Sequence, residues 1–296
     1  MFQVLRIQSL LITLLFVGIY FLLRMIPDQA CGLLHYEEVV NDKGEVEFCA
    51  INEAGFLDLA ILESPINVEL RGPEKWKAGE THPIYLRLKT LEDKILYPQD
   101  IAITHTEKLH LMVIDDHLED YQHLHPVPTL EPGWWLVEIT PKFGGKYHLF
   151  FDLVPVKTRR QIIARNFIEV IGEGATQQQY SNLLSEDKDL KVRLVLGKKP
   201  LYLKQNNEIL LEVVHPKGEL FTLQKVMGDY SHLVAFDENI QGIGHLHPIP
   251  TAKESSKDKA ELAFNFNTPN RGRYRIWAQL KVGGKERFYP FDLEVN

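Results

Sequence analysis

The sequence predicts an all-β protein, with two tandem immunoglobulin-like β-sandwiches that follow one N-terminal transmembrane helix. Three observations support this fold class. Residues 7–23 are almost entirely apolar, several segments in the rest of the chain alternate apolar and polar residues with period two, and residues 110–128 recur as 232–250. Period two is typical of strands, whereas a surface helix shows period 3.6.

Length and charge narrow the possible functions. The 296 residues suffice for an anchor and two domains of about 110 residues each. A net charge of -7, without lysine or arginine clusters interleaved with aromatic residues, gives no surface for phosphate backbones. Nucleic acid is therefore not an expected partner.

The apolar segment Ile7–Leu23 is 17 residues long, and at about 1.5 Å per residue a helix of this length just crosses the hydrocarbon of a bilayer. A cleaved signal peptide is the alternative, but Asp28 stands where a cleavage site requires a small residue. We therefore expect residues 1–27 to form an uncleaved single-pass anchor in a cell membrane, with the domains outside the cytoplasm.

Residues 28–62 are expected to form a membrane-proximal segment with a turn at Asn41–Gly44 between two strand-like pieces. Cys31 and Cys49 flank this turn. Outside the cytoplasm, a disulfide between them would stabilise the hairpin by roughly 2 to 3 kcal/mol. Two free thiols are the alternative.

An internal repeat organises the remainder. The motif of residues 110–128 aligns with residues 232–250 without a gap, and the match continues into the strands that begin at Gly145 and Gly272. We assign residues 63–172 to a first repeat, 173–187 to a polar linker and 188–296 to a second repeat. Short strands punctuated by Gly and Pro predict about seven strands per repeat, as in an immunoglobulin-like sandwich. A barrel is the lesser alternative.

Histidines recur at the same positions of the two repeats. An extended H-x-H places both imidazoles on one face, and the proline that follows favours extended geometry in the preceding histidine. A neighbouring strand would bring His110 in the first repeat, and His232 in the second, beside this pair. This arrangement predicts one metal site per repeat. The candidate ligands are His105, His110, His123 and His125 in the first repeat, and Met227, His232, His245 and His247 in the second.

Neutral imidazole is a strong ligand for copper, zinc and nickel. Met227 replaces His105 at the equivalent position, and copper accepts a thioether that zinc rarely uses. We therefore predict copper, with zinc as the second possibility. A structural alternative also exists, because H-L-H-P could be a strand-ending corner that both repeats keep for packing.

The string H-x4-H-L-x-V, an acidic loop and then H-L-H-P resembles the YtkA-like or FixH-like family of bacterial extracytoplasmic domains. The resemblance covers most of each repeat and implies small immunoglobulin-type modules, often anchored by one helix and associated with copper or heavy-metal handling. It points to the same seven histidines, and Met227 departs from the histidine that the pattern has there.

These observations predict a membrane-anchored protein that binds copper outside the cytoplasm and buffers or delivers it, with a membrane-bound metal transporter or oxidase-type protein as a partner. The alternative is a structural module that recruits another membrane protein without metal. An enzyme is not expected, because no Ser, Cys or carboxylate pair recurs beside the histidines as nucleophile or general acid.

Overall fold

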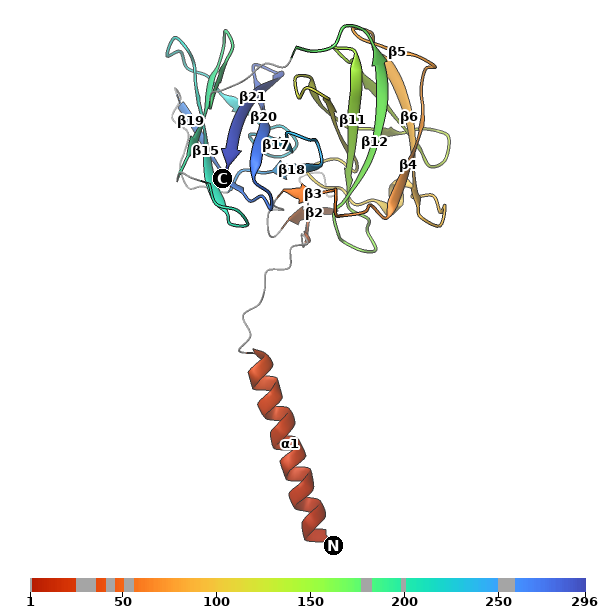
Figure 1. Ribbon diagram of the computed structural model, residues 1–296, viewed down its shortest axis with the longest axis vertical. Helices are drawn as coiled ribbons and strands as arrows, with labels where there is room; N and C mark the ends of the chain where they lie inside the picture. Colours follow the sequence, from red (N-terminus) through yellow and green to blue (C-terminus); the bar gives the residue numbers. More distant parts are fainter. Residues whose placement is uncertain are drawn as a thin grey trace. The chain divides into compact units, whose positions relative to one another are not determined.

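The computed structural model describes residues 2–24, 36–40, 46–50, 56–176, 183–197, 201–249 and 259–296. The chain divides into two compact units, Met1–Gly32 and Leu33–Asn296. The first contains the helix α1 and the second contains the β-strands (Figure 1). Within these described residues the elements are β-strands, apart from the N-terminal helix and one 3-10 turn, η1 (Pro98–Asp100).

The helix α1 spans Phe2–Arg24 and includes the whole apolar stretch of the sequence. Its described apolar side chains between Leu11 and Leu22 are exposed. Among the described residues, no helix has both the length and the apolarity that crossing a membrane requires. Membrane attachment stays a prediction from the sequence.

Strands β1 (Tyr36–Val40) and β2 (Val46–Ala50) form an antiparallel hairpin, as the turn between two strand-like pieces predicts. Cys31 lies outside the described residues, and so does the side chain of Cys49. The predicted disulfide therefore falls outside the part of the chain that the structure describes.

The first repeat forms two packed sheets. One sheet has the order β4 (Ile66–Arg71), β6 (His82–Thr90), β10 (Trp134–Ile139) and β9 (Val127–Pro128). The other has the order β5 (Trp76–Lys77), β12 (Ile162–Ile171), β11 (Gly145–Leu153), β7 (His110–Asp115) and β8 (Tyr121–Leu124). Their inner faces enclose an apolar core that includes Leu86, Leu111 and Tyr147.

The second repeat has the same two-sheet architecture. One sheet has the order β13 (Leu184–Glu186), β14 (Lys191–Leu196), β15 (Asn207–Val214) and β19 (Lys259–Phe266). The other has the order β16 (Leu223–Gln224), β20 (Gly272–Val282), β17 (His232–Asp237), β18 (Gly242–Leu246) and β3 (Leu57–Asp58), and β21 (Lys285–Val295) also pairs with β20. Strand β13 lies inside the stretch 173–187 that we predicted as a linker, so this sandwich begins before residue 188.

Strand β3 comes from the segment that precedes the first repeat, yet it pairs with the second. Asp58 lies opposite Gly242 of β18. The neighbouring Phe56 is buried in the core of the second sandwich, edge-on to Tyr274 with ring centroids 5.1 Å apart. The end of the predicted membrane-proximal segment 28–62 is thus an integral part of the second sandwich.

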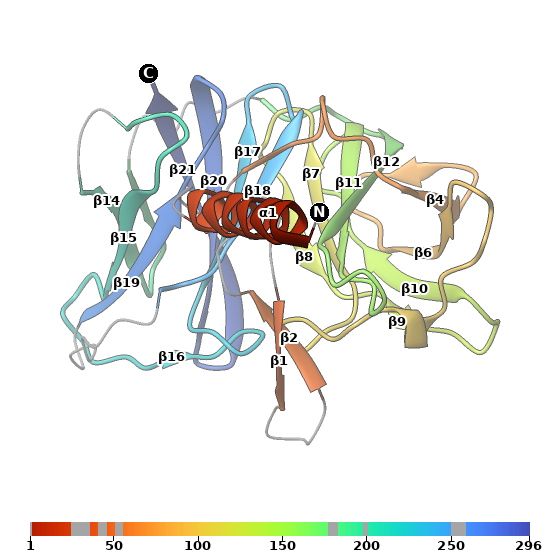
Figure 2. The ribbon, with the colours of Figure 1, turned by 90° about the horizontal axis from the view of Figure 1, so that it is seen from below.

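Strands β17 and β18 of the second sandwich lie beside β7 and β8 of the first (Figure 2). A third apolar cluster with side chains from both sandwiches packs between them. Strand β7 is buried at every position, because Leu111 faces the core of its own sandwich while Met112 faces the other repeat. In β17, Leu233 and Val234 divide in the same way. This burial on both faces explains why HLMVI and HLVAF are continuous apolar runs rather than alternating ones.

A buried arginine also joins the repeats. Nη1 of Arg275 donates to the backbone oxygen of Leu118 in the first repeat at 2.9 Å, and Nε donates to Oδ1 of Asp292 at 2.6 Å. Buried charges are costly unless they are paired. The contact therefore fixes the orientation of one sandwich against the other.

Candidate metal centre

His110 of β7 and His232 of β17 each lie on the strand face that meets the other repeat. His110 shares a face of β7 with Met112, whose side chain is in the interface cluster, and His123 of β8 lies opposite Met112 in register. In the second repeat His245 of β18 lies opposite Val234 in the same way. Both histidine groups consequently reach the junction of the two sandwiches.

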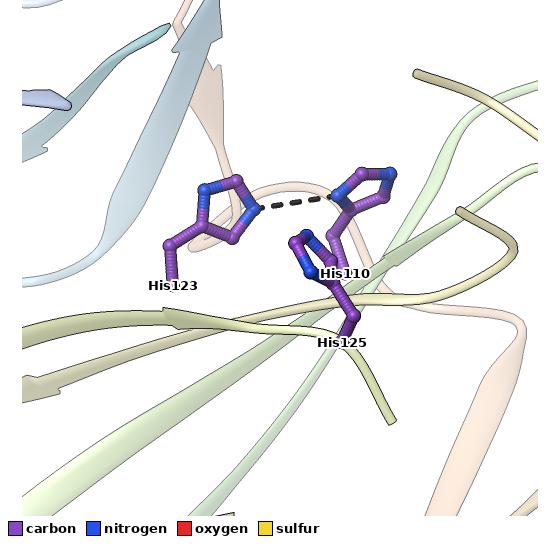
Figure 3. Close-up of side chains that lie close together, drawn as sticks. All are labelled: His110, His123 and His125. Atoms are coloured by element: carbon purple, nitrogen blue, oxygen red, sulfur yellow. Dashed lines mark hydrogen bonds between the residues drawn. The ribbon is translucent and has the colours of Figure 1, made fainter. Parts of the chain in front are cut away.

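His110, His123 and His125 form what we call the first triad (Figure 3). Nδ1 of His110 lies 3.3 Å from Nε2 of His123, the pair joined by the dashed line in Figure 3. The ring of His125 lies 5.1 Å from each of the other two rings, centroid to centroid. One nitrogen from each ring falls within 4.8 Å of the others, so a single ion can reach all three.

His232, His245 and His247 form the second triad. The ring centroids of His232 and His245 are 5.5 Å apart, the same separation as between their counterparts in the first triad. His247 lies 4.7 Å from each of them. These three residues also offer nitrogens within 4.8 Å of one another. The structure thus brings together the three histidines that the sequence grouped in each repeat.

A backbone carbonyl fixes the proton on the first histidine of each triad. Nε2 of His110 is 2.9 Å from the oxygen of Thr104, and Nε2 of His232 is 2.9 Å from the oxygen of Val226. Because a carbonyl oxygen only accepts, Nε2 carries the hydrogen in each neutral ring and Nδ1 presents a lone pair to the triad. Hydrogen bonds of this kind orient the histidine ligands of metal sites.

The second histidine of each triad is oriented by the other repeat. Nδ1 of His123 donates to Oε1 of Gln279 at 2.9 Å. The amide of Gln279 is itself fixed, because its Nε2 donates to Glu286 at 2.9 Å. Nδ1 of His245 lies 3.3 Å from Oδ2 of Asp152. In both rings Nε2 is left with its lone pair directed toward the triad.

Asp152 and Gln279 occupy equivalent positions of the two repeats. Asp152 lies opposite His110 in the ladder of β11 and β7, and Gln279 lies opposite His232 in the ladder of β20 and β17. Each supports a histidine of the other repeat. The two triads are therefore related by an approximate twofold exchange of the repeats, and the rings of His123 and His245 are only 5.3 Å apart.

These tautomers leave the inner nitrogens without partners. In the first triad two lone pairs face each other, those of His110 Nδ1 and His123 Nε2. Within the described part of the chain, Nδ1 of His232 and Nε2 of His245 are buried and accept no hydrogen bond. A buried polar atom without a partner costs about 1 to 3 kcal/mol. A cation at the centre of each triad would satisfy all of these atoms.

Burial keeps the imidazoles neutral. Desolvation by burial, the largest cause, lowers the pKa of His105 and His110 to about 3 and that of His125 to about 4. Burial also holds the pKa values of three further rings well below their ordinary value: His123, His232 and His247. Neutral imidazole is the form that binds metal, so these histidines need no deprotonation at neutral pH.

The pKa of Asp152 is lowered despite its burial. Desolvation alone would raise it, but lowering effects that include the hydrogen bonds from His245 and Gln161 outweigh that effect. The second triad thus has an ionised carboxylate behind one of its rings. The first triad has the neutral amide of Gln279 at the equivalent place.

His105 does not lie where the sequence interpretation put it. We expected it beside His110, but those ring centroids are 6.4 Å apart. His105 instead stacks on His247, with centroids 3.7 Å apart and ring planes within 11°. Its nitrogen also groups with His247 and Asp229 at ligand distance. The tight turn that carries His105 projects across the interface, which spacing along the chain could not reveal.

Met227 occupies the equivalent turn of the second repeat. Its φ is 51°, against 50° for His105, and its side chain is half-buried. Both turns close with reciprocal backbone hydrogen bonds, between Thr104 and Glu107 and between Val226 and Asp229. That this thioether binds a metal ion stays a prediction from the sequence.

Other residues of the centre escaped the sequence interpretation. Asp152 and Gln279 differ in type, so the internal repeat gives no signal for them, and Asp229 was not singled out. The histidines that lack a counterpart lie in other settings: His82 bonds to the backbone of Lys77 and His148 to Asp116. His35 lies outside the described residues.

Comparison with known proteins finds one matching family model and a set of similar solved structures. A family model for a domain of unknown function, DUF8832, matches residues 185–296, which include the whole second triad. No curated protein matches the chain. Similar solved structures include Escherichia coli α2-macroglobulin activated by porcine elastase, at 12% identity and a TM-score of 0.24, where the match covers 88% of this chain and 24% of that chain.

The fibronectin(III)-like modules of Clostridium thermocellum CbhA are also similar, at 12% identity and a TM-score of 0.21, over 78% of this chain and 94% of that chain. This chain spans about a quarter of the length of the α2-macroglobulin that it matches.

Proposed function

We propose that this protein binds two metal ions, with copper favoured, in the two adjacent histidine triads, and that it buffers or delivers the ion. One observation carries the proposal: in each triad the outer nitrogens of the first two rings are held by oxygen acceptors, so the inner lone pairs converge. Hydrogen-bonded structural histidines would present a donor to an acceptor. Here the inner nitrogens of these rings are unprotonated acceptors, so they cannot donate hydrogen bonds to one another.

The ligand set favours a borderline or soft divalent or monovalent ion. Three neutral imidazoles suit copper, zinc and nickel, whereas magnesium and calcium require oxygen ligands. The half-buried thioether of Met227 adds a donor that favours copper. Zinc is the second candidate, because three histidines also form zinc sites.

The cellular setting is proposed from the sequence. The apolar stretch Ile7–Leu23 and the resemblance to YtkA-like or FixH-like domains support a tether to the bacterial membrane, with the sandwiches outside the cytoplasm. A membrane-bound transporter or oxidase-type protein would then exchange the ion with this chain. Alkaline extraction of isolated membranes tests the tether, because an anchored chain stays in the pellet.

The metal proposal is tested by elemental analysis of the purified full chain after loading with copper or with zinc and removal of excess ion. We expect two equivalents per chain. The double variant His123→Ala, His245→Ala should lose most of the bound metal. A matched double variant, His117→Ala with His148→Ala, removes as many histidines away from the triads and should retain two equivalents.

Unchanged stoichiometry in the His123→Ala, His245→Ala variant would reject these ligands. Failure of the unaltered chain to retain either metal would reject the function itself. The alternative of a non-catalytic module that recruits another membrane protein would then be favoured.

A further inference from the structure

We propose that the two metal sites are completed crosswise: the turn of each repeat supplies the fourth donor of the other repeat's triad. His105 joins the second triad, and Met227 joins the first. This inference rests on the proposed metal binding and deepens it. It assigns an all-imidazole site to His232, His245 and His247 and a mixed imidazole and thioether site to His110, His123 and His125.

The position of His105 supports the first half of the proposal, the assignment of His105 to the second triad. Its ring stacks on His247 at 3.7 Å and lies 5.9 Å from His232. It lies about equally far from His245 of the second triad, at 6.3 Å, and from His110 of the first, at 6.4 Å, so the stacking on His247 is what distinguishes the two sites. Asp229, the last residue of the opposite turn, also lies within ligand distance of His105. His105 therefore belongs to the second site in space, although it belongs to the first repeat in sequence.

The approximate twofold relation between the repeats supports the second half of the proposal, the assignment of Met227 to the first triad. His123 is supported by Gln279 and His245 by Asp152, which are equivalent residues reaching across in opposite directions. Each turn is also tied to the first histidine of its own repeat, by Thr104 to His110 and by Val226 to His232. An exchange of repeats that places His105 on His247 accordingly places Met227 toward His125.

The crosswise pairing changes which of the two sites receives the soft thioether ligand. Pairing within each repeat would give the thioether to the second triad. Crosswise pairing gives it to the first triad, which also has the uncharged Gln279 behind His123. A thioether and a neutral surrounding favour Cu(I). The second triad has four imidazoles and the carboxylate of Asp152 behind His245, a set that accepts Cu(II) as well.

The test is copper K-edge X-ray absorption on the full chain loaded with Cu(I), in a background where Cys31→Ser and Cys49→Ser remove the thiols. A first-site-only protein carries His245→Ala and His247→Ala, and a second-site-only protein carries His123→Ala and His125→Ala. We expect a sulfur scatterer at about one per copper in the first-site-only protein and none in the second-site-only protein.

Two further variants separate the donors. Met227→Leu should remove the sulfur signal of the first-site-only protein, whereas Met112→Leu, a control for the other nearby thioether, should keep it. His105→Ala should weaken Cu(I) binding by about tenfold or more in the second-site-only protein and leave the first-site-only protein unchanged.

Sulfur in the second-site-only protein, or its persistence after Met227→Leu, would overturn the crosswise assignment. So would a loss of affinity on His105→Ala in the first-site-only protein instead of the second. Copper retained at two equivalents without any of these patterns would leave metal binding standing and reject the crossing alone. No retained copper would reject the proposed function itself.

Discussion

Gln279 of the second repeat accepts a hydrogen bond from His123 of the first, with 2.9 Å between Oε1 and Nδ1. Its counterpart Asp152 has the same relation to His245. One support is neutral and the other is charged, although the two positions are equivalent. The two metal sites should therefore differ in affinity, because a carboxylate behind a histidine raises its basicity as a ligand.

The first prediction concerns this difference. Asp152→Asn should weaken the second site by about 10- to 100-fold, since the amide still accepts from His245 but removes the charge. Gln279→Glu should tighten the first site. Competition titrations with a chelator of known affinity measure both constants. As a control, Glu131→Gln removes the charge of an exposed carboxylate that pairs with Arg71, and should leave both constants unchanged. Equal constants in all the variants would show that the supports do not tune the sites.

The second prediction concerns pH. The folded pKa values of His105 and His110 lie near 3 and that of His125 near 4, whereas unfolded histidine titrates near 6.5. Below pH 6.5 the unfolded chain therefore binds more protons, and the free energy of unfolding falls as the pH falls, by up to about 1.4 kcal/mol per pH unit for each such histidine. Above pH 6.5 these groups contribute no pH dependence.

Denaturant titrations of the metal-free chain between pH 7.5 and 4.5 measure this slope. His125→Asn should flatten it, and the exposed-loop variant His117→Asn should not. A free energy of unfolding that is constant from pH 6.5 to 4.5 would contradict the burial of neutral imidazoles.

The third prediction concerns the interface. Phe236 is fully buried between the sandwiches, with its ring 5.8 Å from that of Tyr121 and 5.6 Å from that of Phe150. Phe236→Leu should destabilise the chain by about 1 to 2 kcal/mol and weaken metal binding, because the triads lose their rigid junction. Phe264→Leu, in the core of the second sandwich, is the matched control. It should cost similar stability and leave metal affinity nearly unchanged, so equal effects on affinity would argue against coupling through the interface.

The fourth prediction concerns the docking of β3. A Cβ at Gly242 would lie 2.2 Å from the ring of Phe56 and 2.5 Å from the backbone oxygen of Leu57. Gly242→Ala should therefore displace β3 and expose residues 56–60 to proteolysis, at a cost of about 1 to 3 kcal/mol. At Gly244 the nearest atom would be 3.5 Å away, so Gly244→Ala should be tolerated. Equal protease resistance of the two variants would contradict the close packing at Gly242.

The sequence predicted the β class, the duplication and the members of each triad, for physical reasons. Period-two alternation reports strands directly, and His123 and His125 must share a face in any extended segment. The return of β8 beside β7 then places His110 next to them. These relations are local, so they follow from spacing alone.

The contacts between repeats could not be predicted in this way. His105 reaches His247, and Gln279 reaches His123, only because two sandwiches pack face to face. The continuous apolar runs after His110 and His232 were a usable signal. A strand buried on both faces needs a second covering layer, and here the other repeat supplies it.

The pairing of β3 with β18 also has a consequence for synthesis. Phe56 and Leu57 leave the ribosome before the first sandwich is made, but their partner strand, which contains Gly242, is among the last to appear. The strands of the first sandwich are all synthesised while β3 is still unpaired. The second sandwich can be completed only when nearly the whole chain has been synthesised. Contacts so distant along the chain form slowly, so completion of this ladder is expected to be a late step in the maturation of the protein.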